Sequence, residues 1–141
     1  MKARSMNLDM GLRGEILELR LFIPGRPPSP NRDRRRHWTA DARAVAERRR
    51  TAHLSAIDAR NRSGRADDFP IPRAELEIVF HLARAAGDLY NLLAGSKAFI
   101  DGLVDGGVLA GDGVGKLDRI TLGWTKAVGI EGVEITLRER R

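Results

Sequence analysis

The hydrophobic pattern of the chain predicts four strands. In residues 15–23 (EILELRLFI), apolar side chains occupy every second position from Leu17, and Glu18 and Arg20 lie on the opposite side. The same alternation recurs in residues 74–83 (AELEIVFHLA). Residues 117–126 and 132–140 have the composition of two further strands, joined by the short turn AVGIEG. Each of these segments is expected to bury one face against a core.

Two other segments have helical spacing. Thr39 can cap a helix running from about Ala40 to Arg60, in which Ala, Val and Leu recur between arginines. Residues 91–107 (NLLAGSKAFIDGLVDGG) show the same period and end in a glycine pair. The order is β-α-β-α-β-β, so we expect a small single α+β domain with a mixed four-stranded sheet and two main helices. Residues 1–14 are expected to be a flexible leader and residues 15–141 the folded domain.

The second helix carries three kinds of side chain around its axis. A wide apolar arc lies beside a narrow acidic edge formed by Asp101 and Asp105, with Lys97 between the two. The remaining side consists of small residues: Ala94, Gly95, Ala98 and Gly102. Small residues let another backbone approach closely, so this face is a candidate contact with a second subunit. A helix lying under a loop is the alternative.

Composition narrows the class of protein. A chain of 141 residues is large enough for one core, and the hydrophobic fraction of 42% argues against disorder throughout. The sequence has no run of 18 apolar residues, no secretory signal and no Cys, so we expect a cytoplasmic protein without disulfides or thiolate metal sites. A structural zinc site is not expected either, since only His37, His53 and His81 remain as soft ligands.

The positive charge is concentrated in one quarter of the chain. Residues 26–50 hold nine Arg and three acidic residues, a net charge of +6 that equals the excess of the whole chain. Arginine has a planar fork suited to bidentate phosphate contacts, so this segment indicates a protein that binds a nucleic-acid backbone. Frequent use of Arg on a solvated face explains the composition equally well at this point.

Three polar residues around the second helix could carry chemistry. Asp88 precedes the helix, Lys97 lies inside it, and Asp112 follows it in the glycine-rich loop LAGDGVGK. If both loops fold over the same end of the sheet, the two carboxylates meet and can hold Mg²⁺, while Lys97 helps to neutralise a phosphodiester. Each residue also has a structural interpretation. Asp88 can cap a helix with Asn91, Lys97 and Asp101 can form an i, i+4 surface pair, and Asp112 can form a turn.

Two stretches resemble a known family. DLYNLLAGSKAFIDGLVDGGVLAGD is similar to the signature of RusA-type Holliday junction resolvases, which runs roughly D-x-D-N-L, Lys, D-x-L, G-x-L and a terminal Asp. FIPGRPPSPNRDRRRHW resembles the Pro-rich loop near the N-terminus of that family. The resemblance extends over about residues 17 to 138.

The resemblance implies a small α+β homodimeric endonuclease that cuts four-way DNA junctions with Mg²⁺, for which Mn²⁺ is a possible substitute. Asp88 and Asp112 match the first and last metal-site aspartates, and Lys97 matches the catalytic lysine. Such an enzyme serves recombination and repair in the prokaryotic or phage-infected cytoplasm, associated with the nucleoid, without a membrane or a small-molecule cofactor. A C₂ dimer would present two equal sites, and its contact is expected at the small-residue face or at an apolar strand edge.

Two departures from the family pattern matter. Tyr90 stands where the family has its second aspartate, and the spacing between Asn91 and Lys97 is longer by about one helical turn. The Asn91 carbonyl, a backbone carbonyl or water could replace the missing carboxylate. DNA contacts are expected from arginines in and after the Pro-rich loop and at one strand end: Arg32, Arg34, Arg35, Arg36 and Arg84.

Two alternatives to the nuclease remain open. A junction-binding protein that has lost part of its metal site is favoured by Tyr90. An Arg-rich RNA- or protein-binding module is the other, although the strands offer no aromatic-rich platform for stacking bases.

Overall fold

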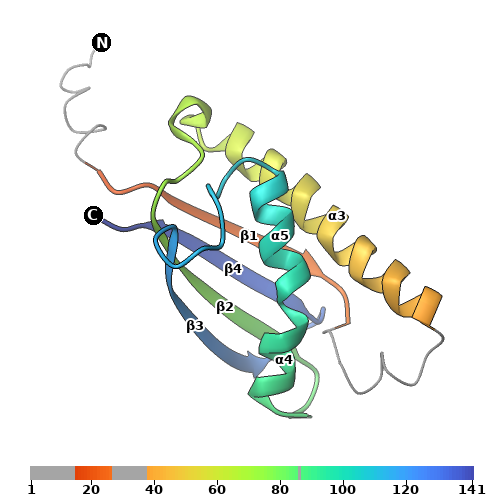
Figure 1. Cartoon of the computed structure of the whole chain (residues 1–141). Coiled ribbons are helices and arrows are strands. Elements are labelled where there is room, and N and C mark those ends of the chain that lie inside the picture. The colour runs from red at the N-terminus through yellow and green to blue at the C-terminus, as the bar shows by residue number, and fades with distance from the viewer. Residues whose placement is uncertain (1–14, 27–37, 86) are drawn as a thin grey trace.

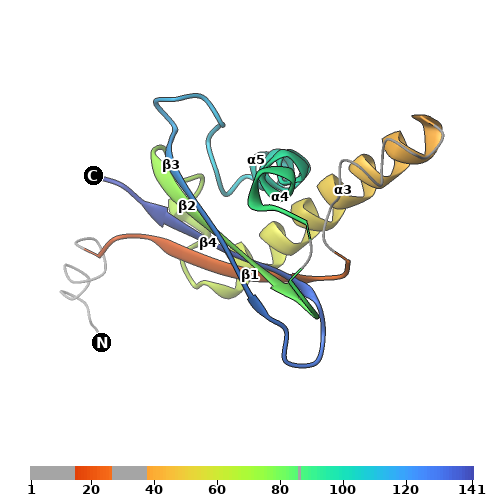
Figure 2. The ribbon, with the colours of Figure 1, turned by 90° about the horizontal axis from the view of Figure 1, so that it is seen from below.

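Four strands form one sheet, and the helices lie on one of its faces (Figures 1 and 2). The computed structural model describes residues 15–26, 38–85 and 87–141. The strands are β1 (Glu18–Pro24), β2 (Ala74–Leu82), β3 (Leu117–Lys126) and β4 (Gly132–Glu139). The helices are α3 (Trp38–Arg62), α4 (Leu89–Gly95) and α5 (Lys97–Asp105), with a 3₁₀ turn η1 at Ala66–Asp68.

The strand order across the sheet is β1-β4-β2-β3. Strand β4 pairs antiparallel with both β1 and β2, whereas β2 and β3 are parallel. The parallel pair follows from the connection between them, because a crossover through α4 and α5 returns the chain to the end at which β2 began. The expected α+β fold with a mixed four-stranded sheet is therefore confirmed.

The alternation of apolar and polar residues separates the two faces of the sheet. Every second side chain of β1 and β2 is buried under the helices, as in Leu19, Leu21, Ile78 and Phe80. The residues between them lie on the uncovered face, where Phe22 and His81 make an edge-to-face ring contact. This is the pattern expected of a sheet covered on one side only.

The helix expected over residues 91–107 is interrupted at Ser96. The hydroxyl of this buried serine donates a hydrogen bond to the Leu92 carbonyl at 2.8 Å, and its backbone N–H donates to Leu93 O at 2.9 Å. These bonds, together with Gly95, end α4 and let the chain start again as α5. The interruption sets Lys97 at the first position of α5, facing solvent.

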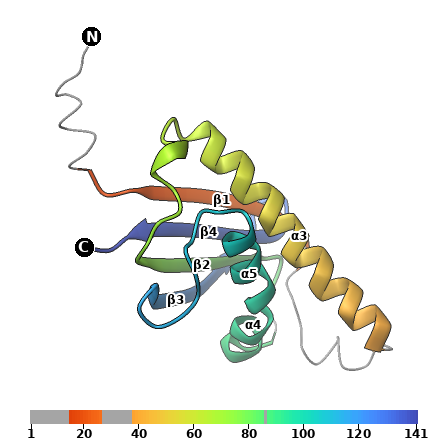
Figure 3. The same ribbon diagram turned by 45° about the horizontal axis from the view of Figure 1, so that its top comes forward.

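Helix α3, not a second subunit, covers the small-residue face of α5. A Cβ placed on Gly102 would lie 2.5 Å from the Ala52 Cβ, and one on Gly106 would lie 2.7 Å from the Ala56 Cβ. Figure 3 shows the two helices side by side across the sheet. The expectation of close backbone approach was right. Ala98 and Gly102 are buried within the chain and offer no free surface to a second subunit, whereas Ala94 of the same small-residue face is exposed; dimerisation itself stays a prediction.

Part of the sequence interpretation lies outside the described residues. This applies to the leader at residues 1–14, to Arg32, Arg34, Arg35 and Arg36, and to the Thr39 side chain. Among the residues that are described, no helix has both the length and the apolar character needed to cross a membrane.

Candidate functional site

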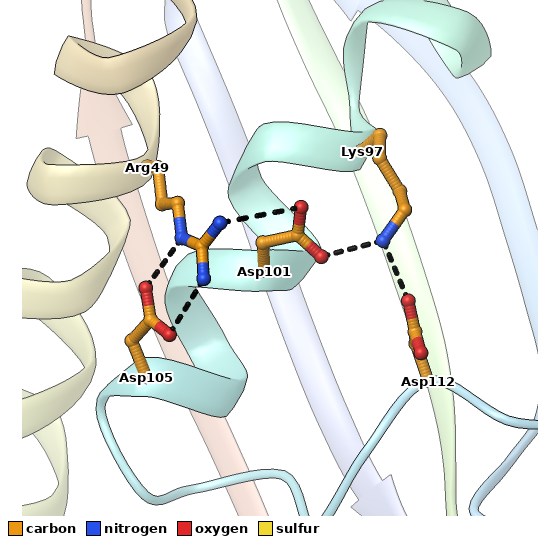
Figure 4. A network of polar contacts seen from close by, with 5 residues as sticks. All are labelled: Arg49, Lys97, Asp101, Asp105 and Asp112. Atoms are coloured by element: carbon orange, nitrogen blue, oxygen red, sulfur yellow. Dashed lines mark hydrogen bonds and ion pairs between the residues drawn. The ribbon is translucent and has the colours of Figure 1, made fainter.

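The Lys97 ammonium lies between two carboxylates on the exposed side of α5 (Figure 4). Its Nζ donates to Asp101 Oδ1 at 2.5 Å and to Asp112 Oδ2 at 2.6 Å. Asp101 is one helical turn after Lys97, whereas Asp112 comes from the loop that leads into β3. The structure thus joins two of the three residues expected from the sequence and adds Asp101 to them.

An arginine from α3 extends this cluster. Arg49 forms a bidentate ion pair with Asp105, with Nε–Oδ2 at 2.6 Å and Nη2–Oδ1 at 3.0 Å. Its Nη1 lies 4.0 Å from Asp101 Oδ2. Negative and positive groups therefore alternate along the exposed edge of α5, and α3 is tied to the same edge that presents Lys97. We call the set Asp105, Arg49, Asp101, Lys97 and Asp112 the charged chain.

Hydrogen bonds within the charged chain shift the pKa values of Lys97, Asp105 and Asp112 towards their ionised forms. The pKa of Lys97 is raised, chiefly by its hydrogen bond to Asp101 and then by that to Asp112. The hydrogen bond from Lys97 lowers the pKa of Asp112, and that from Arg49 lowers the pKa of Asp105. At neutral pH Lys97 is a protonated donor, so it can neutralise charge but cannot act as a general base.

The loop carrying Asp112 is fixed at its base. Leu109 forms an isolated parallel bridge with Ile71. The N–H of Ile71 donates to Val108 O at 2.9 Å, and the Ile71 carbonyl accepts from Ala110 N at 3.1 Å. At the far end, Gly113 O accepts from the N–H groups of residues 116 and 117, both at 2.9 Å. These bonds close the loop into a turn and hold Asp112 at its exposed tip.

Asp88 has the structural role that the sequence offered as its alternative. It is the N-cap of α4, where its Oδ1 accepts from Asn91 N at 2.9 Å and its Oδ2 accepts from Asn91 Nδ2 at 3.4 Å. Among the described residues, no hydrogen bond or ion pair joins Asp88 to Lys97 or Asp112.

The expectation that both loops lie over one end of the sheet was wrong. Strands β2 and β3 are parallel, with Ala74 opposite Leu117 and Leu82 opposite Lys126. The loop that carries Asp88 leaves the carboxyl end of β2, whereas the loop that carries Asp112 enters the amino end of β3. A parallel pair places these two points at opposite ends of the sheet.

Two further residues singled out from the sequence are exposed. Tyr90, which replaces the family's second aspartate, is 82% exposed on the first turn of α4. Arg84 is exposed in the loop after β2. Neither has a hydrogen bond or ion pair within the described part of the chain, so both are accessible to a ligand.

The described residues contain no cluster of three or more His, Cys, Asp or Glu side chains arranged to hold a metal ion. The carboxylates that do converge are those of Asp101 and Asp112, which share the Lys97 ammonium. Compared with known proteins, the chain matches no protein-family model and no curated protein.

Sequence reasoning missed Arg49. It lies in a run of three arginines, and nothing in the local pattern separates it from its neighbours. The signal that could have found it is the pair Asp101 and Asp105, spaced one helical turn apart on α5. Such an acidic edge beside a small-residue face predicts a basic partner from whichever helix packs there.

Proposed function

We propose that the chain is a metal-dependent DNA endonuclease of the RusA type that cuts four-way junctions. The observation that carries the proposal is the Lys97 ammonium held by Asp101 and Asp112 on an exposed helix face. Lys97 and Asp112 are the residues that the family resemblance assigns to catalysis and to the metal. An exposed lysine beside carboxylates suits phosphodiester hydrolysis, which needs both a cation site and neutralisation of the phosphate.

The donor set fits a hydrated magnesium ion. Mg²⁺ is usually bound by one or two carboxylates, with water and phosphate oxygens completing its octahedron. One oxygen of Asp101 and one of Asp112 both contact the Lys97 ammonium, so two carboxylates already converge on a positive charge. These two side chains would hold the ion, and Asp88 would join them only if it left its capping position. When bound, the ion supplies a more acidic water and neutralises phosphate charge.

Lys97 supplies charge to the reaction from the chain itself. Its raised pKa keeps it protonated, and its side chain is 62% exposed, so it can reach a phosphate oxygen. Moving from a carboxylate to the phosphate would place a hydrogen-bond donor where negative charge develops. In this proposal Lys97 stabilises the transition state and does not remove a proton.

The distribution of Arg supports a nucleic-acid partner. The segment of residues 26–50 carries the entire excess of positive charge. Its later part forms the first half of α3, and the guanidinium of Arg49 in this helix lies beside the Asp101 carboxylate. A backbone bound to this segment would therefore pass close to Lys97. Binding through phosphates releases counterions, so affinity is expected to fall steeply with salt.

One observation favours a junction-binding protein without cleavage. Asp88 caps α4, and Tyr90 has no carboxylate. Two of the three positions that hold metal-binding acids in RusA-type resolvases therefore supply no free carboxylate in this conformation. A protein of this kind would bind the junction through its arginines and leave the phosphodiester intact.

A cleavage assay separates the two functions. A labelled four-way junction and a matched duplex are incubated with the purified chain in Mg²⁺, Mn²⁺ or EDTA. We expect symmetric cuts in the junction with either metal and none in EDTA. Asp112→Asn should abolish cutting while binding stays equal or tightens, since a negative charge near phosphate is removed. Asp67→Asn, an exposed aspartate in η1, is the matched control.

The same assay assigns the second ligand. Loss of cutting in Asp101→Asn but not in Asp88→Asn would place the metal on the charged chain, and the reverse would restore the family assignment. Tight binding of the junction without cuts in any metal would establish the binding protein instead. Cutting by Asp112→Asn at the wild-type rate would refute the proposed site.

A further inference from the structure

A small apolar cavity opens at the carboxyl ends of β2 and β3. Its volume is about 180 Å³. The lining is almost wholly apolar: Leu82, Ala85, Gly87, Asp88, Leu89, Leu92 and Trp124. Trp124 forms one wall and is 44% exposed, although it lies on the helix-covered side of the sheet. We call this space the Trp124 cavity.

The Trp124 cavity, at about 180 Å³, is small for a binding site. A space of about 180 Å³ is below the range of about 300–1,000 Å³ that is usual for drug-sized ligands. It therefore suits a single flat ring system.

The position of the Trp124 cavity follows from the parallel strand pair. Phe80 lies opposite Trp124 and Leu82 opposite Lys126, so the cavity is at the end where both strands finish. In sheets with parallel strands, ligands commonly bind in the crevice outside the carboxyl ends. The cavity also borders Asp88, so it lies next to one of the residues that the family resemblance assigns to the site.

Two cations lie within two residues of the residues that line the cavity. Lys126 is the last residue of β3 and Arg84 lies two residues beyond the end of β2, and both are exposed. Within the described part of the chain neither of them forms an ion pair, unlike Lys97 and Arg49. An aromatic wall with free cations beside it matches the two parts of a nucleotide, a base with a π face and an anionic phosphate.

We propose that the Trp124 cavity receives one unstacked base of the bound DNA. The base stacks on the Trp124 indole, and the neighbouring phosphates contact Arg84 and Lys126. The inference rests on the proposed function, because it takes DNA as the ligand. It adds a way in which the protein would recognise a distorted junction. Unstacking a base costs least where its pairing is already disturbed, so the cavity would favour a distorted crossover over an intact duplex.

The test is a binding cycle in EDTA, where no cutting occurs. The full chain is titrated with a four-way junction and with the same junction lacking the bases at its crossover nucleotides. Removing a stacking aromatic side chain costs about 1–3 kcal/mol per base, so Trp124→Leu should weaken binding of the intact junction about 5- to 150-fold. The abasic junction should bind equally to both proteins, because the stacking partner is already missing.

Two variants and a fluorescence measurement serve as controls for the binding cycle. Trp124→Phe should keep most of the affinity, since a ring remains. Ile120→Ala changes an exposed apolar residue on the same side of β3 that does not line the cavity, and it should leave affinity unchanged. Because the chain has only two tryptophans, Trp38→Phe leaves Trp124 as the sole indole, and its fluorescence should be quenched by the intact junction only.

The outcomes distinguish the inference from the proposed function. Equal losses on intact and abasic junctions, or no loss, would overturn the base-binding cavity even if the wild type cuts junctions in Mg²⁺. Coupling in the cycle, together with no cutting of the junction in a separate assay with Mg²⁺ or Mn²⁺, would support the cavity and refute the nuclease. A change of molecular mass by light scattering in Trp124→Leu would show that the surface is a contact between two copies, and failure to bind any DNA would overturn both proposals.

Discussion

Replacing Gly102 with alanine should destabilise the protein, although helix propensity predicts the opposite. In an unhindered helix interior, alanine is more favourable than glycine by about 1 kcal/mol. Gly102 is not unhindered, because α3 crosses α5 there. An added Cβ would lie 2.5 Å from the Ala52 Cβ, 2.5 Å from the Arg49 carbonyl oxygen and 2.9 Å from the His53 nitrogen. Two of these three atoms are backbone, so no side-chain rotation can relieve the clash.

The size of the effect follows from these distances. Non-bonded carbon atoms prefer a separation of about 3.5–4.0 Å, so the two helices must part by about 1 Å. Overpacking of a filled core costs about 1–3 kcal/mol and occasionally more. Because two of the clashing atoms are backbone, we take the upper part of this range, about 2–3 kcal/mol. After the gain of about 1 kcal/mol from helix propensity is subtracted, we expect a net loss of about 1–2 kcal/mol in the free energy of unfolding. In a domain of this size that lowers Tm by about 3–8 °C.

Thermal and denaturant unfolding followed by circular dichroism measure this loss. Gly123→Ala is the matched control, because a Cβ at Gly123 meets no atom within 4 Å. Adding Ala52→Gly to Gly102→Ala should restore only part of the stability, since the Arg49 carbonyl remains in place. A Gly102→Ala protein as stable as the wild type would refute the close packing of α3 on α5.

Four further changes test other parts of the structure. Tyr90→Asp should raise cleavage or lower the Mg²⁺ concentration required, as a restored carboxylate would; reduced cleavage would give Tyr90 a role of its own. Asp88→Ala should cost about 0.5–2 kcal/mol of unfolding free energy through loss of the α4 cap, measured by urea titration. Leu103→Ala, at a fully buried site, should cost about 2–5 kcal/mol in the same assay, and a smaller loss would argue against a filled core. Arg49→Gln should reduce stability above about pH 4, where Asp105 is ionised in both the folded and the unfolded state. Because the pKa of Asp105 is lowered in the folded protein, the difference in stability from wild type should vanish as the pH falls through that folded-state pKa. A difference in stability that does not depend on pH would contradict the pairing of Arg49 with Asp105.

The strands could be predicted from the sequence because each obeys a local rule. Alternating burial in β1 and β2 reproduces the alternation of apolar residues, and β3 coincides with the expected residues 117–126. Helix α3 extends the expected range by two residues at each end. These features depend on the side chains of the segment itself and on one covered face.

The break at Ser96 could not be predicted from periodicity. The apolar arc continues through it, and a serine in mid-helix is common enough that nothing marks it as a boundary. What ends α4 is the burial of its hydroxyl, which donates to the Leu92 carbonyl. Burial of this kind is a property of the packed chain and is absent from the local pattern.

The candidate site was predictable in part. Lys97 and Asp112 were placed in one candidate site, and the i, i+4 contact of Lys97 with Asp101 was given as the structural alternative, because helix spacing is a local feature. The relation of Asp88 to Asp112 was not, since it depends on whether β2 and β3 run parallel. The partner of Asp105 likewise depended on how α3 packs on α5.

The net charge of the charged chain bears on how the proposed nuclease would bind a metal ion and DNA. Three carboxylates and two cations make up the charged chain, which leaves one net negative charge facing solvent. In the proposed function, this negative surface would repel an approaching phosphodiester, even though the arginines of residues 26–50 would attract the rest of the backbone. Asp101 and Asp112 would hold the divalent cation, whose positive charge would offset that repulsion and leave Lys97 available to the phosphate. Tight binding of the scissile phosphate is therefore expected to depend on the metal.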